Sequence, residues 1–399
     1  DYLWDEDIGM YVYGNSYQNQ LPYFGANFWE DWEYPFTLHY FDTDGTLAWQ
    51  GEAGAKIFGG WSRAAYQRSF SLFARQEFGT GKFDHKFFDE RPYTEFESLV
   101  LRNSGNDWAY SMIRDAVMTS LMEGSRVDYQ ACKPVATYLN GEYWGFYNMR
   151  EKISEHFLAS LHGVDPEEID LLENDAEVKH GNNTDYIALR TFIETHPMAD
   201  SANYAWVTDQ VDETSFIQYQ VAQIYYNNQD WPGNNNRYWK AGDGEWRWIL
   251  FDTDFGVGLF DAYGYLANTL EFATATNGPS WPNPPWSTLF LRRFLENDMF
   301  RRDFINAFAD AMNSVYLPAY AIARVDSIAD NIWGEIHRHR QRWGQSISSW
   351  NSSVGRMRTF FSKRPEYMRS HIMNKFALPE VHEINTAIND VEAGSIRVN

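Results

Sequence analysis

Two aspartates stand directly after an apolar, strand-like segment in the second half of the chain. Residues 248–251 read Trp-Ile-Leu-Phe, and Asp252, Asp254 and Gly256 follow in the sequence Asp-Thr-Asp-Phe-Gly. Carboxylates at the end of a buried strand can ligate a divalent metal ion, and a glycine beside them permits a tight turn. The alternative interpretation is an acidic turn that binds nothing, and the pair by itself leaves both open.

A second polar element precedes the first. Asp230 and Asn235 stand five positions apart, with Pro232 and Gly233 between them favouring a loop. Phosphoryl transfer needs one carboxylate to orient the attacking hydroxyl and accept its proton. It also needs an amide and another carboxylate to hold Mg²⁺ against nucleotide phosphates. Protein kinases place these groups in the same order, with the later carboxylate in an Asp-Phe-Gly element. The ordered pair of elements therefore favours phosphoryl transfer over two unrelated turns.

The elements that must position these loops fall into a strand-rich part followed by a helix-rich part. Alternating apolar residues predict strands over much of residues 1–100, and Asn140 with Gly141 predicts a tight hairpin turn. Apolar residues at helical spacing predict a helix over residues 106–124 and mainly helices after residue 285. We therefore predict an α+β fold with two lobes, a β-rich N-terminal lobe and a helical C-terminal lobe.

Composition and charge limit the kind of partner. The 399 residues are 44% hydrophobic and 18% aromatic, which is ample for a large core. A net charge of −22 argues against non-specific nucleic-acid binding and favours divalent cations or basic partners. The single cysteine, Cys132, cannot form an internal disulfide and is interpreted as a core residue. No apolar run reaches the length of a membrane span.

Two further charged segments have simpler interpretations. Asp42, Asp44 and Gly45 resemble the start of a calcium loop, but the complete ligand pattern is missing and a hairpin turn is favoured. A structural calcium ion remains the alternative there. The basic segment 337–344 is expected to lie on a helix with a solvated face.

The chain resembles the spore coat protein H (CotH) kinase family of atypical secreted protein kinases. The resemblance spans about residues 50–260 and lies in five stretches, 53–75, 99–122, 133–153, 227–239 and 246–259. It implies an atypical protein kinase-like fold over residues 1–380, with an N-terminal lobe to about residue 155 and a C-terminal lobe over residues 156–380. Residues 381–399 are expected to be a linker or the start of a following β module.

The resemblance also implies roles for the two acidic elements. Asp230 matches the catalytic aspartate, Asn235 and Asp254 match metal ligands, and Asp252 is a second metal ligand or a support of the loop. The implied cofactors are ATP with Mg²⁺ or Mn²⁺, and the implied acceptor is a Ser or Thr hydroxyl of a protein.

The implied nucleotide contacts depart from the family pattern. The family usually shows two lysines where this chain has Gln67 and Arg68. Arg68, Arg63 and Glu151 are the residues of this chain that match positions expected to face the nucleotide. Arginine keeps the positive charge but presents a planar fork in place of a point charge.

The resemblance further implies a secreted or surface-exposed bacterial protein with additional modules. The chain opens within Asp-Tyr-Leu-Trp, which we expect to be a start inside a longer protein. The alternative function is a catalytically silent extracellular binding or scaffold module for protein, glycan or calcium. The altered lysine position and the aromatic content favour that alternative, and nucleotide binding would count against it.

Overall fold

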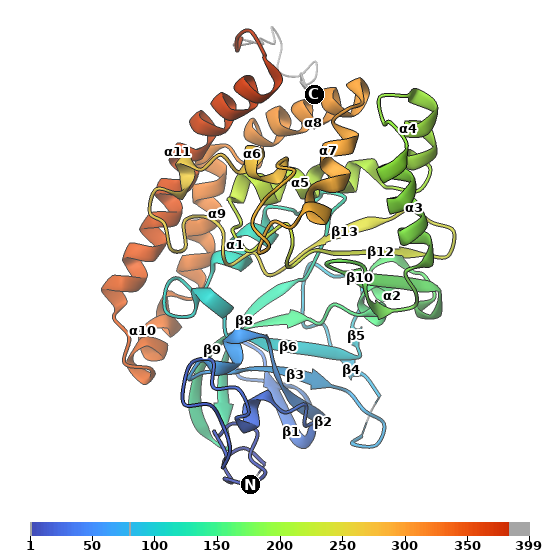
Figure 1. The fold of residues 1–399 in the computed structure, drawn as a ribbon. Coiled ribbons are helices and arrows are strands. Elements are labelled where there is room, and N and C mark those ends of the chain that lie inside the picture. Colours follow the sequence, from blue (N-terminus) through green and yellow to red (C-terminus); the bar gives the residue numbers. More distant parts are fainter. Residues whose placement is uncertain (1, 80, 383–399) are drawn as a thin grey trace, which may run out of the picture.

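A computed structural model describes residues 2–79 and 81–382, and it shows a strand-rich N-terminal lobe and a helix-rich C-terminal lobe (Figure 1). A curled sheet forms the N-terminal lobe. Helices around a second sheet form the C-terminal lobe. The predicted α+β fold class is therefore confirmed. Residues 383–399, which include most of the expected linker, lie outside the described residues.

The N-terminal lobe is built on a six-stranded antiparallel sheet in the order β1-β2-β3-β6-β9-β8. Its strands are β1 (Tyr34–Phe41), β2 (Leu47–Phe58), β3 (Ser69–Phe73), β6 (Ser98–Arg102), β8 (Cys132–Leu139) and β9 (Glu142–Glu151), and β4 (Phe83–Asp84) pairs separately with β5 (Glu95–Phe96). Asn140 and Gly141 join β8 to β9 with positive φ angles of 51° and 83°. Such angles define the tight hairpin turn that these two residues favour, as predicted.

The register of β6 against β9 places two arginines on the same face of the sheet. Arg102 lies opposite Asn148, and Arg150 lies opposite Val100. Side chains two residues apart on neighbouring strands are diagonal neighbours on one face. The opposite face carries Leu101, which packs into the core of the N-terminal lobe. Arg102 and Arg150 therefore point away from that core.

The first helix after this sheet edge is shorter than predicted, because α1 spans only Arg114–Ser120. The Asp107 carboxylate accepts hydrogen bonds from the backbone N–H groups of Ser111 and Arg114, both at 3.0 Å. It therefore holds the preceding residues in a loop and satisfies a free N–H at the start of the helix. The predicted helix over residues 106–124 was wrong in its first half for this reason.

The C-terminal lobe combines a five-stranded sheet with most of the helices. The sheet order is β11-β10-β12-β13-β7, with β7 (Asp128–Tyr129), β10 (Ile169–Glu173), β11 (Glu177–His180), β12 (Arg237–Ala241) and β13 (Arg247–Leu250). The helices are α2 (Glu155–His162), α3 (Thr184–Thr195), α4 (Ser201–Thr208), α5 (Glu213–Tyr226), α6 (Thr269–Ala273), α7 (Leu289–Phe294), α8 (Asp298–Met312), α9 (Pro318–Asn331), α10 (Trp333–Arg342) and α11 (Ile347–Phe376). Across residues 2–79 and 81–382, no helix combines the length and apolar character needed to cross a membrane.

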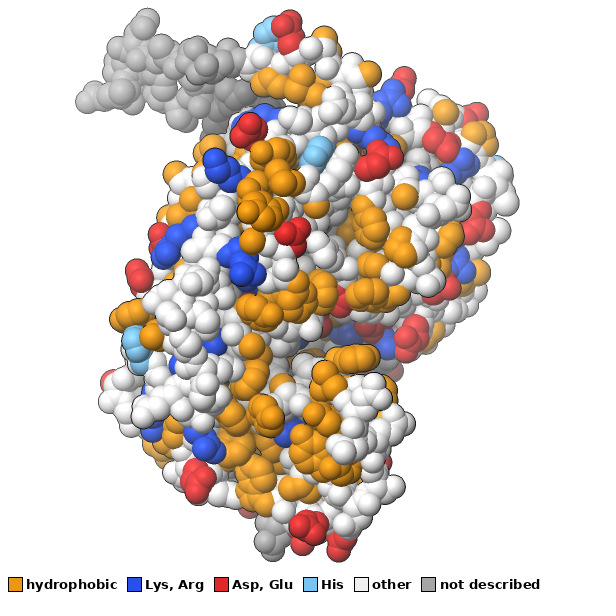
Figure 2. Space-filling view, turned by 60° about the vertical axis from the view of Figure 1, so that its left-hand side comes forward, with side chains coloured by type: hydrophobic (Ala, Val, Ile, Leu, Met, Phe, Trp, Pro, Cys, Tyr) orange, Lys and Arg blue, Asp and Glu red, His pale blue; other side chains and the backbone are white. Residues whose placement is uncertain are grey.

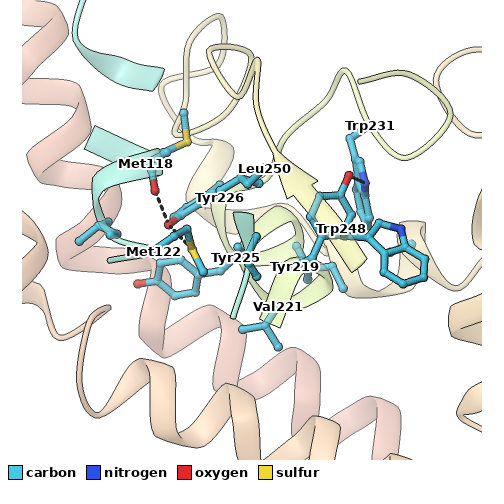
Figure 3. Packing of buried hydrophobic residues seen from close by; sticks show 14 of the residues in the cluster. Met118, Met122, Tyr219, Val221, Tyr225, Tyr226, Trp231, Trp248 and Leu250 are labelled. Atoms are coloured by element: carbon cyan, nitrogen blue, oxygen red, sulfur yellow. Dashed lines mark hydrogen bonds between the residues drawn. The ribbon is translucent and has the colours of Figure 1, made fainter. Parts of the chain in front are cut away.

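Helix α5 runs through the core of the C-terminal lobe and ends directly before the loop that carries Asp230 (Figure 3). Tyr226, its last residue, donates a hydrogen bond from its hydroxyl to the Met118 carbonyl at 2.9 Å. The Trp231 indole donates to the Tyr219 hydroxyl at 3.1 Å, and Trp231 is only 1% exposed. Burial on both sides of Asp230 therefore fixes the backbone of the loop.

Helix α10 belongs to the C-terminal part of the chain but packs against β9 of the N-terminal lobe (Figure 1). The Phe146 N–H donates to His339 Nδ1 at 3.1 Å, and Arg340 donates to the Ala109 and Tyr110 carbonyls. His339 and Arg340 are both buried. The expected helix with a solvated face is confirmed by exposed His337 and Arg338, but the opposite side of α10, which the sequence analysis did not foresee, contacts β9 and the loop before α1.

Candidate functional site

The two aspartates after β13 share one guanidinium group. Arg102 Nη2 lies 2.5 Å from Asp252 Oδ1 and 2.7 Å from Asp254 Oδ2. Asp254 is 1% exposed in its side chain and Asp252 is 33% exposed. Asp252 adopts a left-handed φ of 49°, which turns the chain sharply where the strand ends. Strand β6 of one lobe is thereby tied to the strand end of the other.

The loop before α1 holds the Asp254 carboxylate in place. The Asn106 backbone N–H donates to Asp254 Oδ2 at 3.0 Å, and Asn106 Nδ2 donates to Oδ1 at 3.2 Å. Gly105 has a φ of 56°, and a Cβ atom there would lie 2.2 Å from Asp254 Oδ2. Only glycine therefore allows the backbone to approach this carboxylate so closely.

A third carboxylate, Asp115 of α1, lies behind the pair. Its Oδ2 is 2.8 Å from Arg150 Nη2 and 3.8 Å from Arg102 Nε. Its Oδ1 accepts hydrogen bonds from the Thr253 N–H and hydroxyl at 2.9 and 2.7 Å. Burial alone would raise the pKa of Asp115, but the charges of Arg150 and Arg102 and the bonds from Thr253 lower it.

The pKa of Asp254 is raised, in contrast to that of Asp115. Burial is the main cause of its raised pKa, and the negative charge of Asp252 adds to the effect, against the opposing charge of Arg102. Three carboxylates face two guanidinium groups here, so the cluster has an excess of negative charge. A cation bound between Asp252 and Asp254 would offset this charge.

Asp230 lies on a loop at the C-terminal end of α5. Asn234 Nδ2 donates to its Oδ1 and Asn235 Nδ2 donates to its Oδ2, both at 2.9 Å. Burial raises the pKa of Asp230 to about 6, and the negative charge of Asp252 contributes to the rise. Asp252 acts on the pKa of both Asp230 and Asp254, so the two predicted acidic elements are coupled electrostatically.

The predicted nucleotide-facing arginines contact other parts of the molecule. The Arg68 guanidinium lies over the rings of Phe28 and Tyr11, at 4.0 and 4.7 Å from their centroids. Arg63 donates to backbone carbonyls, including that of Gly59 at 2.6 Å. Since both side chains are held by the N-terminal segment, the structure does not bring them to the carboxylates.

Glu151 is also engaged elsewhere, in a buried ion pair. Its Oε2 accepts from Arg91 Nε at 2.8 Å and from the Ala131 N–H at 2.9 Å, and Tyr93 donates to its other oxygen. Glu151 and Arg91 are 2% and 7% exposed. These contacts anchor the last residue of β9 next to the junction of the lobes. A direct nucleotide contact by Glu151 stays a prediction.

Sequence reasoning missed the basic residues that do lie at the carboxylates. Arg102 and Arg150 are the main ones, and Lys152 lies at the junction of the lobes with its ammonium 5.6 Å from the Phe73 ring centroid. Burial lowers the pKa of Lys152, and the charge of Arg237 adds to this. One feature of the sequence could have identified Arg102. It ends the apolar strand Leu-Val-Leu-Arg, directly before the loop that contains Gly105. Figure 2 shows acidic and basic side chains meeting in the hollow between the lobes.

The site suits a magnesium-type ion better than a protein-only metal cage. Among the described residues, no group of three or more His, Cys, Asp or Glu side chains is arranged to hold a metal. Magnesium is commonly held by one or two carboxylates and by substrate phosphates. Asp252 and Asp254 supply the carboxylates, and Asn235 supplies an amide oxygen next to Asp230. The donor set therefore fits a metal that arrives with a nucleotide.

The other acidic motif forms a turn. Asp42 accepts a backbone hydrogen bond from Gly45 and donates one to Thr46, each at 2.9 Å, between β1 and β2. Asp44 Oδ1 accepts from the Thr46 N–H at 2.8 Å. These bonds close the hairpin that was favoured, and a structural calcium ion there stays a prediction.

Comparisons with known proteins place the fold in a family. The family model described as CotH kinase protein matches residues 55–368. No curated protein matches the chain. The crystal structure of the Helicobacter pylori proinflammatory kinase CtkA is similar at 12% identity and a TM-score of 0.32, with 87% of this chain and 99% of that chain covered. The Shewanella oneidensis MR-1 toxin–antitoxin complex of HipA, HipB and operator DNA is similar at 11% identity and a TM-score of 0.31, with 78% and 66% covered.

Proposed function

Because the chain belongs to the CotH kinase family, we propose that it transfers the γ-phosphoryl group of ATP to a Ser or Thr hydroxyl of a protein, with Mg²⁺ or Mn²⁺ as cofactor. The observation that carries the proposal is the arrangement of the two acidic elements: Asn234 and Asn235 hold Asp230, and Arg102 Nη2 contacts both Asp252 and Asp254. The charge of Asp252 also acts on the pKa of Asp230, which couples the two elements.

Asp230 is suited to take the proton of the acceptor hydroxyl. Asn234 and Asn235 hold both of its oxygens, so the carboxylate has a fixed orientation. A pKa of about 6 leaves it ionised at neutral pH and still basic enough to accept a proton. A general base with a pKa close to the working pH is the most effective kind.

Asp252 and Asp254 are the residues that would hold the metal, with Asn235 as a further ligand. A bound divalent ion supplies positive charge against the phosphate oxygens of the nucleotide. The chain's own contribution is to fix the ligands: Asn106 binds both oxygens of Asp254, and Gly105 lets the backbone approach this carboxylate closely. The buried Asp115–Arg150 pair holds the backbone between Asp252 and Asp254 through Thr253.

We further propose that the protein acts outside the cell as one module of a longer chain. The support is membership of the CotH kinase family, whose model matches residues 55–368 and whose members the sequence resemblance describes as secreted. A signal sequence and appended modules in the full-length gene product would test this part of the proposal.

Transfer of label from γ-labelled ATP tests the chemistry. With Mn²⁺ or Mg²⁺ and a generic Ser/Thr-rich acceptor protein, the chain should label the acceptor, and Asp230→Asn should not. Asp243→Asn is the matched control, because it removes one carboxylate from an exposed turn between β12 and β13. Equal labelling by the Asp230→Asn variant would rule out the proposed base. Absence of labelling and of nucleotide binding in the wild-type protein would favour the silent scaffold.

A further inference from the structure

One side chain occupies the position that a metal ion at the proposed site would need. Arg102 Nη2 contacts Asp252 Oδ1 and Asp254 Oδ2, which are the facing oxygens of the two carboxylates. A divalent ion held by the same pair of oxygens would compete with this guanidinium. Arg102 and the metal are therefore alternative counterions for one pair of carboxylates.

Arg102 is held almost entirely through this one nitrogen. Its Nε lies 3.8 Å from Asp115 Oδ2, beyond hydrogen-bond distance, and is buried without a hydrogen-bond partner. No hydrogen bond or ion pair from its Nη1 to the described residues is present, and the side chain is 12% exposed. Asp115 is already engaged by Arg150 and Thr253. An unsatisfied, partly accessible arginine with a single anchoring point is able to exchange one anionic partner for another.

The charges determine which anion that must be. If a divalent ion takes Asp252 and Asp254, the guanidinium of Arg102 is left next to a cation and close to the buried Arg150. This arrangement is repulsive unless an anion arrives with the metal. A polyphosphate provides such an anion, because arginine binds phosphate oxygens in a bidentate manner.

We propose that Arg102 is an exchangeable counterion: it occupies the metal carboxylates in the nucleotide-free protein and moves to the phosphates when metal and nucleotide enter together. The proposal rests on the proposed function, since it uses the same carboxylates. The family usually has a lysine at the position of Gln67. In this chain, Arg102 would contact the phosphates instead. The proposal also makes metal binding depend on the nucleotide.

The test is Mn²⁺ binding without any nucleotide, measured by the electron paramagnetic resonance signal of the free ion. Arg102→Gln removes the competing guanidinium, so its affinity for Mn²⁺ alone should rise about tenfold or more over wild type, within the usual range of coupling between two ligands. The affinity of the same variant for Mn²⁺-bound, non-hydrolysable ATP should fall. Arg75→Gln is the matched control, because Arg75 carries the same charge in an exposed pair with Glu33 and should change neither value.

The outcomes separate this inference from the proposed function. If Arg102→Gln binds Mn²⁺ alone no more tightly than wild type, while wild type still binds the metal–nucleotide complex, the exchange is wrong and the kinase proposal stands. If neither protein binds Mn²⁺ or nucleotide, both are overturned. Should Arg102→Gln not fold, Arg102→Lys replaces it: the shorter lysine side chain reaches the two carboxylates less well, so Mn²⁺ affinity should rise by a smaller factor, and an unchanged or lower affinity would contradict the exchange.

Discussion

The floor and the roof of the site between the lobes are built in different ways. The floor consists of the loops at Asp230 and at Asp252–Asp254. Asp230 is held by Asn234 and Asn235, a few residues away, whereas Asp254 is held by Asn106 and Arg102, far away in the sequence. The roof consists of Arg102 and Arg150, which lie on paired strands and reach carboxylates far away in the sequence. The Asp230 loop is thus set by local geometry, whereas the Asp252–Asp254 loop and the roof depend on sheet register and on the docking of the lobes.

This difference assigns separate tasks to the two regions. The floor carries the groups that would touch hydroxyl and metal, and it tolerates the energetic penalty of a half-buried Asp230 and a buried Asp254. The positive charges of the roof offset the desolvation penalty of these buried carboxylates. Variants of the floor should therefore affect chemistry first, and variants of the roof and its supports should affect stability and binding first.

The largest expected effect is in the floor, at Asp230. Asp230→Asn should lower phosphoryl transfer by about 10²–10⁴-fold, the usual contribution of a general base. Binding of metal and nucleotide should persist, because Asp252 and Asp254 are unchanged. Transfer by the wild-type protein should rise with pH through an apparent pKa of about 6, as Asp230 loses its proton. A rate that is flat from pH 5 to pH 8 with unaltered binding would argue against Asp230 as the base.

The same substitution should stabilise the fold. The folded-state pKa of about 6 lies above the ordinary value of 3.8, so the folded state holds this proton more tightly than the unfolded state. Stability from this group is therefore present at acid pH and lost as pH rises through about 6. At pH 7 Asp230→Asn should gain about 1–3 kcal/mol over wild type, with the gain vanishing near pH 4. Urea denaturation at both pH values measures this, and a gain that is independent of pH would contradict the assigned cause.

The next largest effect is expected at Gly105, in the loop that links β6 to α1 and contacts Asp254. Gly105→Ala places a Cβ 2.2 Å from Asp254 Oδ2 at a φ of 56°. We expect a loss of about 1–3 kcal/mol of stability from the strained backbone and the displaced carboxylate, together with lost metal–nucleotide binding. Gly124→Ala is the matched control, since its φ is 78° but nothing lies within 4 Å of a Cβ there. It should show the backbone strain alone and keep binding, and equal behaviour of the two variants would show that Asp254 does not need this close approach.

The smallest effect is expected at His339, in the helix that ties the C-terminal part of the chain to the roof. Burial, aided by the charge of Arg340, lowers the pKa of His339 to about 3. The unfolded state takes up a proton near pH 6.5 and the folded state does not, so this stability is present above pH 6.5 and is lost as pH falls toward 3. His339→Gln should reduce the loss of stability between pH 6.5 and pH 5 by about 1–2 kcal/mol.

The control for this prediction lies on the same helix. His337 is exposed two residues earlier, and His337→Gln should leave the pH dependence of urea denaturation unchanged. If both substitutions altered the pH dependence equally, the effect could not be assigned to the buried contact between α10 and β9.

The same contrast explains what was predictable from sequence. The turn at Asn140 and Gly141 and the loop that carries Asp230 and Asn235 are local, so residue types and spacing were sufficient to predict them. Arg102 and Arg150 were missed because their proximity depends on the β6–β9 register, which no short pattern encodes. The contact of Arg68 with the rings of Phe28 and Tyr11 was not predicted, because these aromatic residues lie far from it in the sequence. Helix α1 begins late because Asp107 holds the residues before it in a loop, through contacts that apolar periodicity cannot reveal.

Nucleotide-dependent stability tests the central claim most directly. The thermal midpoint of the purified chain is measured with millimolar ATP, with and without Mg²⁺ or Mn²⁺, beside Asp254→Asn and the exposed control Asp243→Asn. A ligand that binds only the folded state raises the midpoint, so we predict an increase that requires metal and ATP together, persists in Asp243→Asn and disappears in Asp254→Asn. An unchanged midpoint in the wild-type protein, or an equal increase in Asp254→Asn, would contradict a metal–nucleotide site at these carboxylates.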